Sequence, residues 1–503
     1  MSIETLSQYN WSVMLPEFII LGVAALLTIM DLFMPKGQDR RILGWISIAA
    51  IIAAIVSTAS LAGGAVVSIL DDTFRLDSFA IAFKLLLLGG AGLVMFLAVS
   101  YPAKDGMEEY RGEFYYLFLT ALLGAMFMTS SGDLITLFIG LELLTVSSYV
   151  LVGIRKHHLG SNESAMKYVI NGGISTAITL FGMSYVYGLT GSTNLLAIAR
   201  SLSGLTDGQH VYLLGLSFLM IFVGLAFKLA AAPFHMWAPD VYQGAPTPVT
   251  AFLSVVSKTA GFVIVIRILL TVFGSAATKG PGSMPILLDM QDYIAFIAGA
   301  TMIIGNVVAL KQSNIKRMFA YSSIAHAGYI LVAVTSLTSN MFYSIWFYLL
   351  AYLFMNLGAF AVIQVVSEKT GSSKIADFAG LYRRSPGLAV VMGILLISLA
   401  GFPGTAGFIG KLNIFIGAFS GTPHYVLASV MIATTVVSYF YYFGVMTQIF
   451  FRPAASEEKF HIPAGILVVL IVAVVGSILF GVMPNIALDF MNNNLDILAD
   501  FFS

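Results

Sequence analysis

Six cationic side chains lie within long apolar stretches of the sequence, where a charge is costly. They are Lys84, Lys167, Lys228, Lys258, Arg267 and Lys411. An unpaired cation at the centre of a membrane helix costs about 2.5 to 3.5 kcal/mol on insertion scales. Lysine is the informative type, because a buried lysine can release its proton whereas arginine stays charged. The buried lysines are therefore candidates for carrying protons.

One acid, Glu142, matches these lysines in depth, since it lies in the apolar run from Leu134 to Val152. A carboxylate beside a buried lysine stabilises its protonated form, and withdrawal of the carboxylate favours release of the proton. We therefore expect Glu142 to pair with one of the lysines and to control its charge.

Some of the six cations also fit a structural role. Lys84 and Arg267 lie towards the ends of their apolar runs, where a long side chain can reach the interface. Lys167 has Glu163 one helical turn before it, and the two can pair as ordinary helix neighbours. The deeper Lys228, Lys258 and Lys411 favour a transport role.

Two of the deep lysines lie beside residues that interrupt a helix. Pro233 follows Lys228 by little more than one turn, and Lys411 follows a stretch that contains Gly401 and Pro403. Proline removes one helical hydrogen bond and obstructs another, which frees backbone carbonyls. In a membrane such a break persists only where protein or water satisfies those groups. Two interrupted helices with buried lysines indicate two equivalent half-sites.

Composition places these residues in a membrane bundle. Hydrophobic residues make up 58% of the 503 residues and charged residues only 10%, against about 25% charged in soluble domains. The pattern predicts an all-α polytopic transmembrane helical bundle of about fourteen spans. The expected spans are 13–34, 42–62, 76–101, 114–129, 132–154, 164–189, 211–238, 246–274, 291–310, 317–336, 341–367, 386–420, 425–450 and 462–484.

Charge and cysteine content exclude several function classes. Lys plus Arg equals Asp plus Glu at 25 each, so the chain has no basic field for nucleic acid. Cysteine is absent, which excludes disulfides, iron–sulfur ligation and cysteine-type zinc sites. No acidic or histidine cluster has metal-ligand spacing, so we expect no metal or cofactor in this chain.

The loops indicate how the chain crosses the membrane. Lys and Arg accumulate in cytoplasmic loops. With the expected spans, the loops of one side hold most of the basic residues, and those of the other side hold only Arg75, Arg200 and Lys279. This bias predicts that both termini face the outside.

The two broken spans are five spans apart, so they run in opposite directions. We therefore expect a single membrane domain with inverted repeats over 114–274 and 291–450, preceded by three spans in 1–113 and followed by a last span and tail in 451–503. Glu142 in span 5 then matches His326 in span 10. An imidazole is a plausible link between the halves, and a neutral histidine hydrogen-bonded to Ser or Tyr is the alternative.

The run from Lys228 through Pro233-Phe-His-Met-Trp-Ala-Pro and Val241-Tyr-Gln-Gly-Ala-Pro-Thr-Pro-Val-Thr250 to Lys258 resembles the antiporter-like subunits of respiratory complex I, the NADH-quinone oxidoreductase. The Val241–Thr250 form and a lysine at 411 resemble its N-type subunits. The resemblance covers essentially the whole chain. The longer members of that family carry an additional amphipathic lateral helix after the last span, and nothing after residue 484 could form one, which argues against the L-type subunits.

The resemblance also implies roles for single residues. Glu142 and Lys228 would form a pair, and Lys258 would connect the two repeats at the centre. Lys411 would be the terminal proton carrier, and Lys167 would match a further family lysine that is less important for proton transport. It further implies neighbouring antiporter-like and small membrane subunits as partners. The absence of cysteine and of a transit segment favours a bacterial plasma membrane, and organelle-encoded relatives, which also lack a transit segment, are the alternative. NADH, FMN, iron–sulfur clusters and quinone would be bound by partner subunits.

Two other functions fit the same helices. One is a subunit of a cation/proton antiporter complex or of a membrane-bound hydrogenase, which also needs titratable groups at mid-membrane. The other is a structural subunit that anchors its neighbours, which is disfavoured because it leaves the cost of burying the lysines without a purpose.

Overall fold

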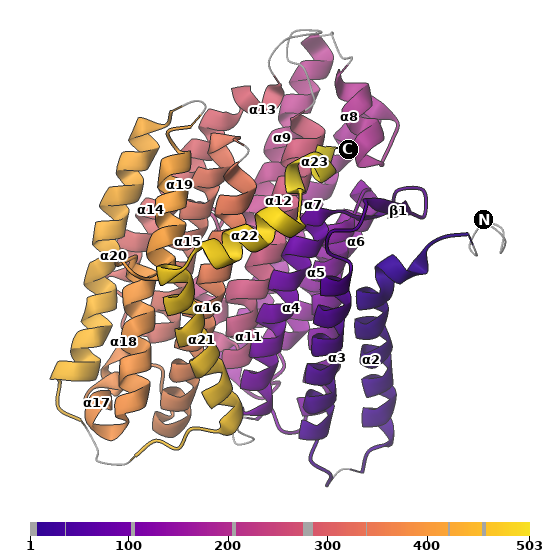
Figure 1. The fold of residues 1–503 in the computed structure, drawn as a ribbon. Helices are drawn as coiled ribbons and strands as arrows, with labels where there is room; N and C mark the ends of the chain where they lie inside the picture. Colours follow the sequence, from indigo (N-terminus) through magenta and orange to yellow (C-terminus); the bar gives the residue numbers. More distant parts are fainter. Residues whose placement is uncertain are drawn as a thin grey trace.

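The computed structural model describes residues 8–35, 37–101, 106–203, 208–274, 285–338, 340–420, 423–454 and 459–502. Helices run side by side across the whole bundle (Figure 1). Lys279, one of the three basic residues expected on the outer side, lies outside the described residues.

Thirteen helices of the described residues are long and apolar enough to cross a membrane. Twelve of them are α2 (Leu15–Phe33), α3 (Arg41–Ser60), α4 (Ser78–Val99), α5 (Arg111–Ser130), α6 (Leu134–Val152), α7 (Leu159–Thr190), α9 (Gly208–Leu229), α14 (Gln291–Ala309), α15 (Ile315–Ser336), α16 (Asn340–Thr370), α20 (Tyr425–Phe451) and α21 (Ala464–Val482). The thirteenth is a composite of α11 (Thr247–Phe252), η3 (Leu253–Ser257), α12 (Lys258–Ile268) and η4 (Leu269–Phe273), in which η3 and η4 are π-helical.

The expected span 386–420 is present as two shorter apolar helices, α18 (Pro386–Ala400) and α19 (Ala406–Gly417). The α18–α19 pair and the thirteen long helices together correspond to the fourteen expected spans. The all-α transmembrane fold is therefore confirmed.

Short elements connect or flank the long helices. Those between long helices are α8 (Leu195–Ser203), α10 (Trp237–Gly244), α13 (Ile286–Asp289), η5 (Ile375–Phe378) and α17 (Leu381–Arg384), whereas η1 (Trp11–Met14) precedes α2, and α22 (Asn485–Asn494) and α23 (Ile497–Phe502) follow α21. The strands β1 (Val67–Ile69) and β2 (Phe74–Leu76) pair antiparallel, with Ser68 opposite Arg75. No strand was expected, and this small hairpin lies in the connection between α3 and α4.

The chain after α21 forms two short helices, which our expectation of no amphipathic lateral helix after residue 484 did not address. The helices α22 and α23, of 10 and 6 residues, cross the front of the bundle to the C-terminus (Figure 1). Arg75 donates a hydrogen bond to the Asp500 carbonyl at 2.6 Å, and the Ser78 hydroxyl donates to the Asp500 carboxylate. These contacts fix the tail on the end of α4.

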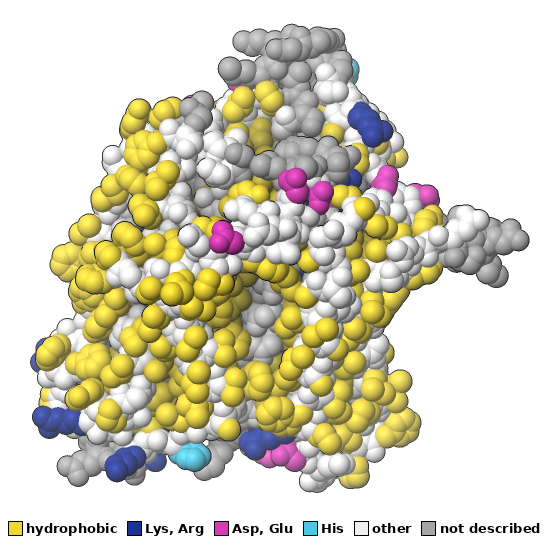
Figure 2. Space-filling model, in the orientation of Figure 1, with side chains coloured by type: hydrophobic (Ala, Val, Ile, Leu, Met, Phe, Trp, Pro, Cys, Tyr) yellow, Lys and Arg dark blue, Asp and Glu magenta, His cyan; other side chains and the backbone are white. Residues whose placement is uncertain are grey.

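Burial separates central from peripheral helices. The composite span Thr247–Phe273 is entirely enclosed, and α15 and α16 are nearly so, whereas fewer than half of the residues in the apolar stretches of α7, α20 and α21 are buried. Apolar side chains cover the exposed flank of the bundle, as expected for contact with lipid, while Lys and Arg gather along its lower edge (Figure 2). The elements with Lys258 and His326 are thus the best shielded from lipid.

Candidate functional site

Lys228 lies in the last turn of α9, where the first broken span ends. Ala230 adopts a left-handed conformation with φ +56°, and the chain resumes as α10 only at Trp237. The Lys228 side chain is 6% exposed, and its ammonium donates a hydrogen bond to the Thr145 hydroxyl at 3.0 Å. A polar partner from α6 therefore stabilises this buried cation.

Glu142 lies one turn before Thr145 on α6, and its carboxylate accepts a hydrogen bond from the Thr176 hydroxyl at 2.9 Å. Glu142 and Lys228 form no ion pair within 4.0 Å, so the direct contact that we expected is absent. The carboxylate still acts on Lys228 through its electrostatic field. Glu142 and Lys228 are thus separated in this structure, and the Lys228 ammonium is hydrogen-bonded to Thr145 instead.

Lys258 begins α12, directly after the π-helical η3, and is 3% exposed. Its ammonium donates hydrogen bonds to the backbone carbonyl and to the hydroxyl of Ser323, both at 2.5 Å. The same hydroxyl lies 3.2 Å from the phenol oxygen of Tyr242 in α10. Lys258 thus connects the central helix α15 with the second half of the first broken span.

His326 lies one turn beyond Ser322 and Ser323 on α15. Its Nδ1 is 2.6 Å from the Tyr348 hydroxyl, and its Nε2 is 3.1 Å from the Tyr442 hydroxyl. The Tyr442 hydroxyl also bonds to the Ser322 hydroxyl. A buried histidine hydrogen-bonded to tyrosines was our alternative to a proton link, and these contacts fit both interpretations.

Lys411 lies in α19, after the second break, and is 6% exposed. Its ammonium donates to the carbonyls of Leu399 and Ala400, each at 3.0 Å, which are the last two of α18. Gly401 at the break has φ +85°, and a Cβ there would lie 2.9 Å from the Lys411 side chain. Lys411 therefore satisfies carbonyls that the break has freed, and it approaches because residue 401 is glycine.

Lys258, His326 and Lys411 form one polar row along α15. His326 lies in the electrostatic field of both lysines, and the Lys411 ammonium is 4.9 Å from the centre of the Tyr329 ring, one turn beyond His326. Sequence reasoning missed the hydroxyl members of this row, which are Ser322, Ser323, Tyr329, Tyr348 and Tyr442. Those on α15 recur at helical spacing on one face, which is a signal visible in the sequence.

Comparison with known proteins agrees with this geometry. The family model described as "NADH:quinone oxidoreductase/Mrp antiporter, TM" matches residues 131–438. NADH-quinone oxidoreductase subunit N of Geobacillus sp. (strain WCH70) is 62% identical over 492 residues, which cover 98% of this chain and 100% of the relative. The chain belongs to the subunit N family of NADH-quinone oxidoreductase.

Solved structures contain the same fold. A chain of respiratory complex I from Thermus thermophilus is 29% identical, with a TM-score of 0.76, and the match covers 94% of this chain and 99% of that one. A chain of the Mrp complex from Dietzia sp. is 19% identical with a TM-score of 0.82, over 98% of this chain and 100% of that one. At that identity the second likeness shows the fold alone.

Lys167 does not belong to the buried row of this subunit. Its side chain is 42% exposed, so our description of it as buried is wrong. It forms ion pairs with Glu163 at 2.6 Å, as its helical spacing suggested, and with Asp240 at 2.7 Å. Arg317 pairs with the same Asp240 carboxylate. Burial raises the pKa of Asp240, but hydrogen bonds from Lys167 and Arg317 outweigh it and hold that pKa below its ordinary value.

Arg267 and Lys84 are each paired with an acid that we had not matched to them. Arg267 binds Asp77 through two bonds of 2.6 and 2.7 Å and also donates to the Thr129 carbonyl, which indicates a structural role. Lys84 lies 2.5 Å from Glu17 of α2. Glu142 is therefore not the single acid at the depth of the cations.

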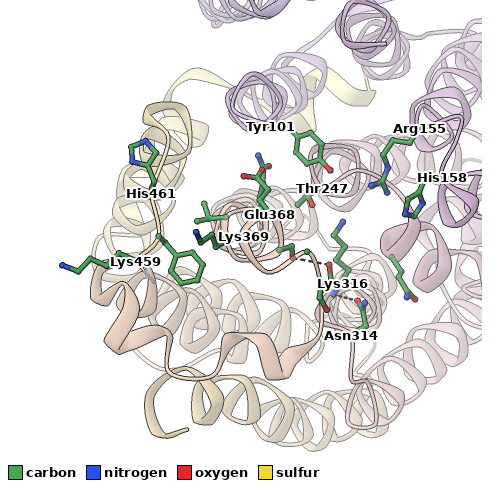
Figure 3. A pocket seen from close by; sticks show the side chains of 18 residues that line it. Tyr101, Arg155, His158, Thr247, Asn314, Lys316, Glu368, Lys369, Lys459 and His461 are labelled. Atoms are coloured by element: carbon green, nitrogen blue, oxygen red, sulfur yellow. Dashed lines mark hydrogen bonds between the residues drawn. The ribbon is translucent and has the colours of Figure 1, made fainter. Parts of the chain in front are cut away.

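A cavity of about 790 Å³ opens at the end of the bundle where α15 begins and α16 ends (Figure 3). Its lining is mostly polar and includes Tyr101, Arg155, His158, Gln243, Thr247, Asn314, Lys316, Glu368 and Lys369. Gln243 directly precedes Gly244 and follows Tyr242, whose hydroxyl contacts Ser323. The cavity lining thus includes the sequence neighbour of Tyr242, and Tyr242 in turn contacts Ser323, the hydrogen-bond acceptor of Lys258.

Among the described residues, no three His, Cys, Asp or Glu side chains cluster as metal ligands. The chemistry that the row supports is proton exchange between lysine, histidine and hydroxyl groups.

Proposed function

We propose that this NADH-quinone oxidoreductase subunit carries protons across the membrane through Lys228, Lys258, His326 and Lys411, with Glu142 controlling the charge of Lys228. The observation that carries the proposal is the burial of three lysines, each at most 6% exposed, in or beside interrupted helices. Such cations persist in a membrane only with polar partners, and the partners here include groups that themselves exchange protons.

The proposed route begins at the end of the bundle that holds the polar cavity, and Lys228 is its first proton carrier. When Glu142 and Lys228 approach, the protonated lysine is stabilised, and when they separate its proton is released towards Lys258. Ser323 and Tyr242 are hydrogen-bonded at Lys258, and His326 with its two tyrosines lies between Lys258 and Lys411. The proton leaves from Lys411 on the opposite side. Lys167 contributes by fixing Asp240 at the end of α10, outside the buried row.

We further propose the two inverted repeats at 114–274 and 291–450. They are supported by a backbone clasp that recurs between the start of one helix and the end of the next. The four hydrogen bonds are Leu134 N to Thr193 O, Leu195 N to Gly132 O, Ile315 N to Ser373 O, and Ile375 N to Ser313 O. Gly191 and Gly371 hold equivalent left-handed positions beside these clasps, with φ +68° and +67°. The tripeptide Thr-Gly-Ser at 190–192 and 370–372 was a sequence signal that we missed.

The basic end of the bundle is proposed to face the cytoplasm of a bacterium, with both termini outside, because basic loops stay on the cytoplasmic side. Neighbouring antiporter-like and small membrane subunits are the proposed partners. NADH, FMN, iron–sulfur clusters and quinone would be bound by partner subunits, and electron transfer among them would drive the separation of Glu142 from Lys228.

Replacement of Lys258 by Ala tests the proposal. In inverted membrane vesicles, the variant complex should reduce quinone while moving fewer protons per electron than the wild type. Lys311→Ala, at an exposed lysine outside the row, is the matched control and should leave the ratio unchanged. An unchanged ratio in Lys258→Ala would overturn the route. Purification of the tagged subunit without redox-active partners or quinone reduction would reassign it to a secondary antiporter.

A further inference from the structure

A second buried lysine–carboxylate pair lies outside the proposed route. Glu17 in the first turn of α2 and Lys84 in the second turn of α4 are 1% and 0% exposed, and their Oε1 and Nζ atoms are 2.5 Å apart. Both belong to the three spans that precede the proposed repeats. The function described above assigns no role to either residue.

The pair differs from the nearby Arg267–Asp77 pair in how well its polar atoms are satisfied. Asp77 receives two bonds from Arg267 and one from the Ala80 N–H, and Arg267 also reaches a backbone carbonyl. Besides their ion pair, the Glu17 carboxylate and the Lys84 ammonium make no hydrogen bond to another side chain within the part of the chain that the structure describes. The Phe74 ring also lies beside the ammonium, with its centre 4.9 Å away.

This isolation argues against a stabilising role. Removing two charges from water costs several kcal/mol per ion, and the attraction offsets that cost only where further hydrogen bonds satisfy the remaining polar atoms. Replacing a buried ion pair by an apolar pair of similar volume is often neutral or stabilising. The pair is instead well arranged for proton exchange: breaking an N–H bond of Lys84 and forming an O–H bond on Glu17 leaves two neutral groups, and the reverse step restores both charges.

Helix α4 connects the pair with the centre of the bundle. The Ala82 carbonyl, two residues before Lys84, accepts a hydrogen bond from the Trp346 indole of α16 at 2.9 Å. Further along α4, a Cβ on Gly90 would lie 3.2 Å from Val256 of η3, the π-helical turn that directly precedes Lys258. A shift of α4 that separates Glu17 from Lys84 would therefore press on the turn that holds Lys258.

We propose that Glu17 and Lys84 form an additional proton-exchanging site of this subunit, coupled to Lys258 through α4. The inference rests on the proposed proton-carrying function. Other charged groups at the same end of α4 bond with one another, and no ion pair among the described residues joins them to Glu17 or Lys84. They are Arg75, Asp77, Arg267 and Asp500.

The experiment compares Glu17→Gln, Lys84→Met and the double variant in the intact oxidoreductase in inverted membrane vesicles. Assembled complex, quinone reduction and protons moved per electron are measured. Each single variant leaves one charge buried alone and should reduce the amount of assembled complex. The double variant should assemble as the wild type does but move fewer protons per electron. A wild-type ratio in an assembled double variant would overturn the proposal.

Two further measurements keep the outcome decisive. If the double variant does not assemble, the infrared difference spectrum of the wild-type complex on reduction should contain a carboxyl band that shifts in Glu17→Asp, and absence of that shift overturns the proposal. Lys258→Ala is measured in parallel. A lowered ratio in Lys258→Ala with a normal double variant refutes only the Glu17–Lys84 site, whereas normal ratios in both refute the proton-carrying function.

Discussion

Gly401→Ala should impair proton movement by displacing Lys411, and Gly404→Ala should not. Both glycines are left-handed, with φ +85° and +88°, so alanine introduces similar backbone strain of about 1–2 kcal/mol at either position. Only at 401 does the new methyl group meet the lysine, at 2.9 Å from its Cδ and 3.3 Å from its Nζ, while at 404 nothing lies within 4 Å. The difference between the two variants therefore isolates the position of Lys411.

The displaced ammonium would lose hydrogen bonds to the Leu399 and Ala400 carbonyls. Bonds to a charged donor are worth about 1.5–3 kcal/mol each, more than the backbone strain, so the protonated state of Lys411 becomes the costly one. The assay is protons moved per electron in inverted vesicles, normalised to assembled complex. Gly401→Ala should lower the ratio and Gly404→Ala should lower only stability. Equal ratios in the two variants would refute the reasoning that Lys411 acts from this position.

Three other predictions follow from single contacts. Tyr442→Phe removes the hydroxyl between Ser322 and His326, so proton movement should slow while assembly, followed by native gel, stays normal. Asp77→Asn leaves Arg267 buried without its counter-ion, so it should cost about 3–5 kcal/mol and the complex should be lost on mild heating. The pKa of Asp240 is below its ordinary value, so its ion pairs stabilise the fold above that ordinary pKa and the contribution is lost as pH falls through the lowered one. Asp240→Asn should therefore lower the melting temperature at neutral pH and match the wild type in strong acid.

The spans and the deep lysines were predictable because their signals are local. A run of apolar residues near the length of a membrane is visible without knowledge of its neighbours, and depth within the run identifies Lys228, Lys258 and Lys411 as costly. Proline and glycine near two of them likewise predict the breaks. Each of these inferences needs only one segment of sequence.

The charge partners were harder to predict because they depend on packing between helices. Glu17 lies in the first turn of its span and resembles an interfacial residue until α4 covers it. Lys167 also lies within an expected span, yet its side chain on α7 remains 42% exposed. The same limitation affects Glu142, which was expected to touch Lys228 and instead bonds to Thr176 of α7. Depth in a span follows from sequence, whereas the direction of a side chain does not.

The two broken helices satisfy their freed carbonyls differently, and this gives the half-sites different chemistry. At the first break, the Phe227 carbonyl accepts a hydrogen bond from the Trp237 indole at 2.9 Å, so Lys228 is available to Thr145 and to the field of Glu142. At the second break the lysine itself satisfies the carbonyls of Leu399 and Ala400. The charge of Lys228 should thus respond to movement of a carboxylate, and that of Lys411 to the geometry of the break beside it. A proton route whose first lysine, Lys228, responds to a carboxylate and whose last lysine, Lys411, responds to backbone geometry can hold a proton at one end while releasing it at the other.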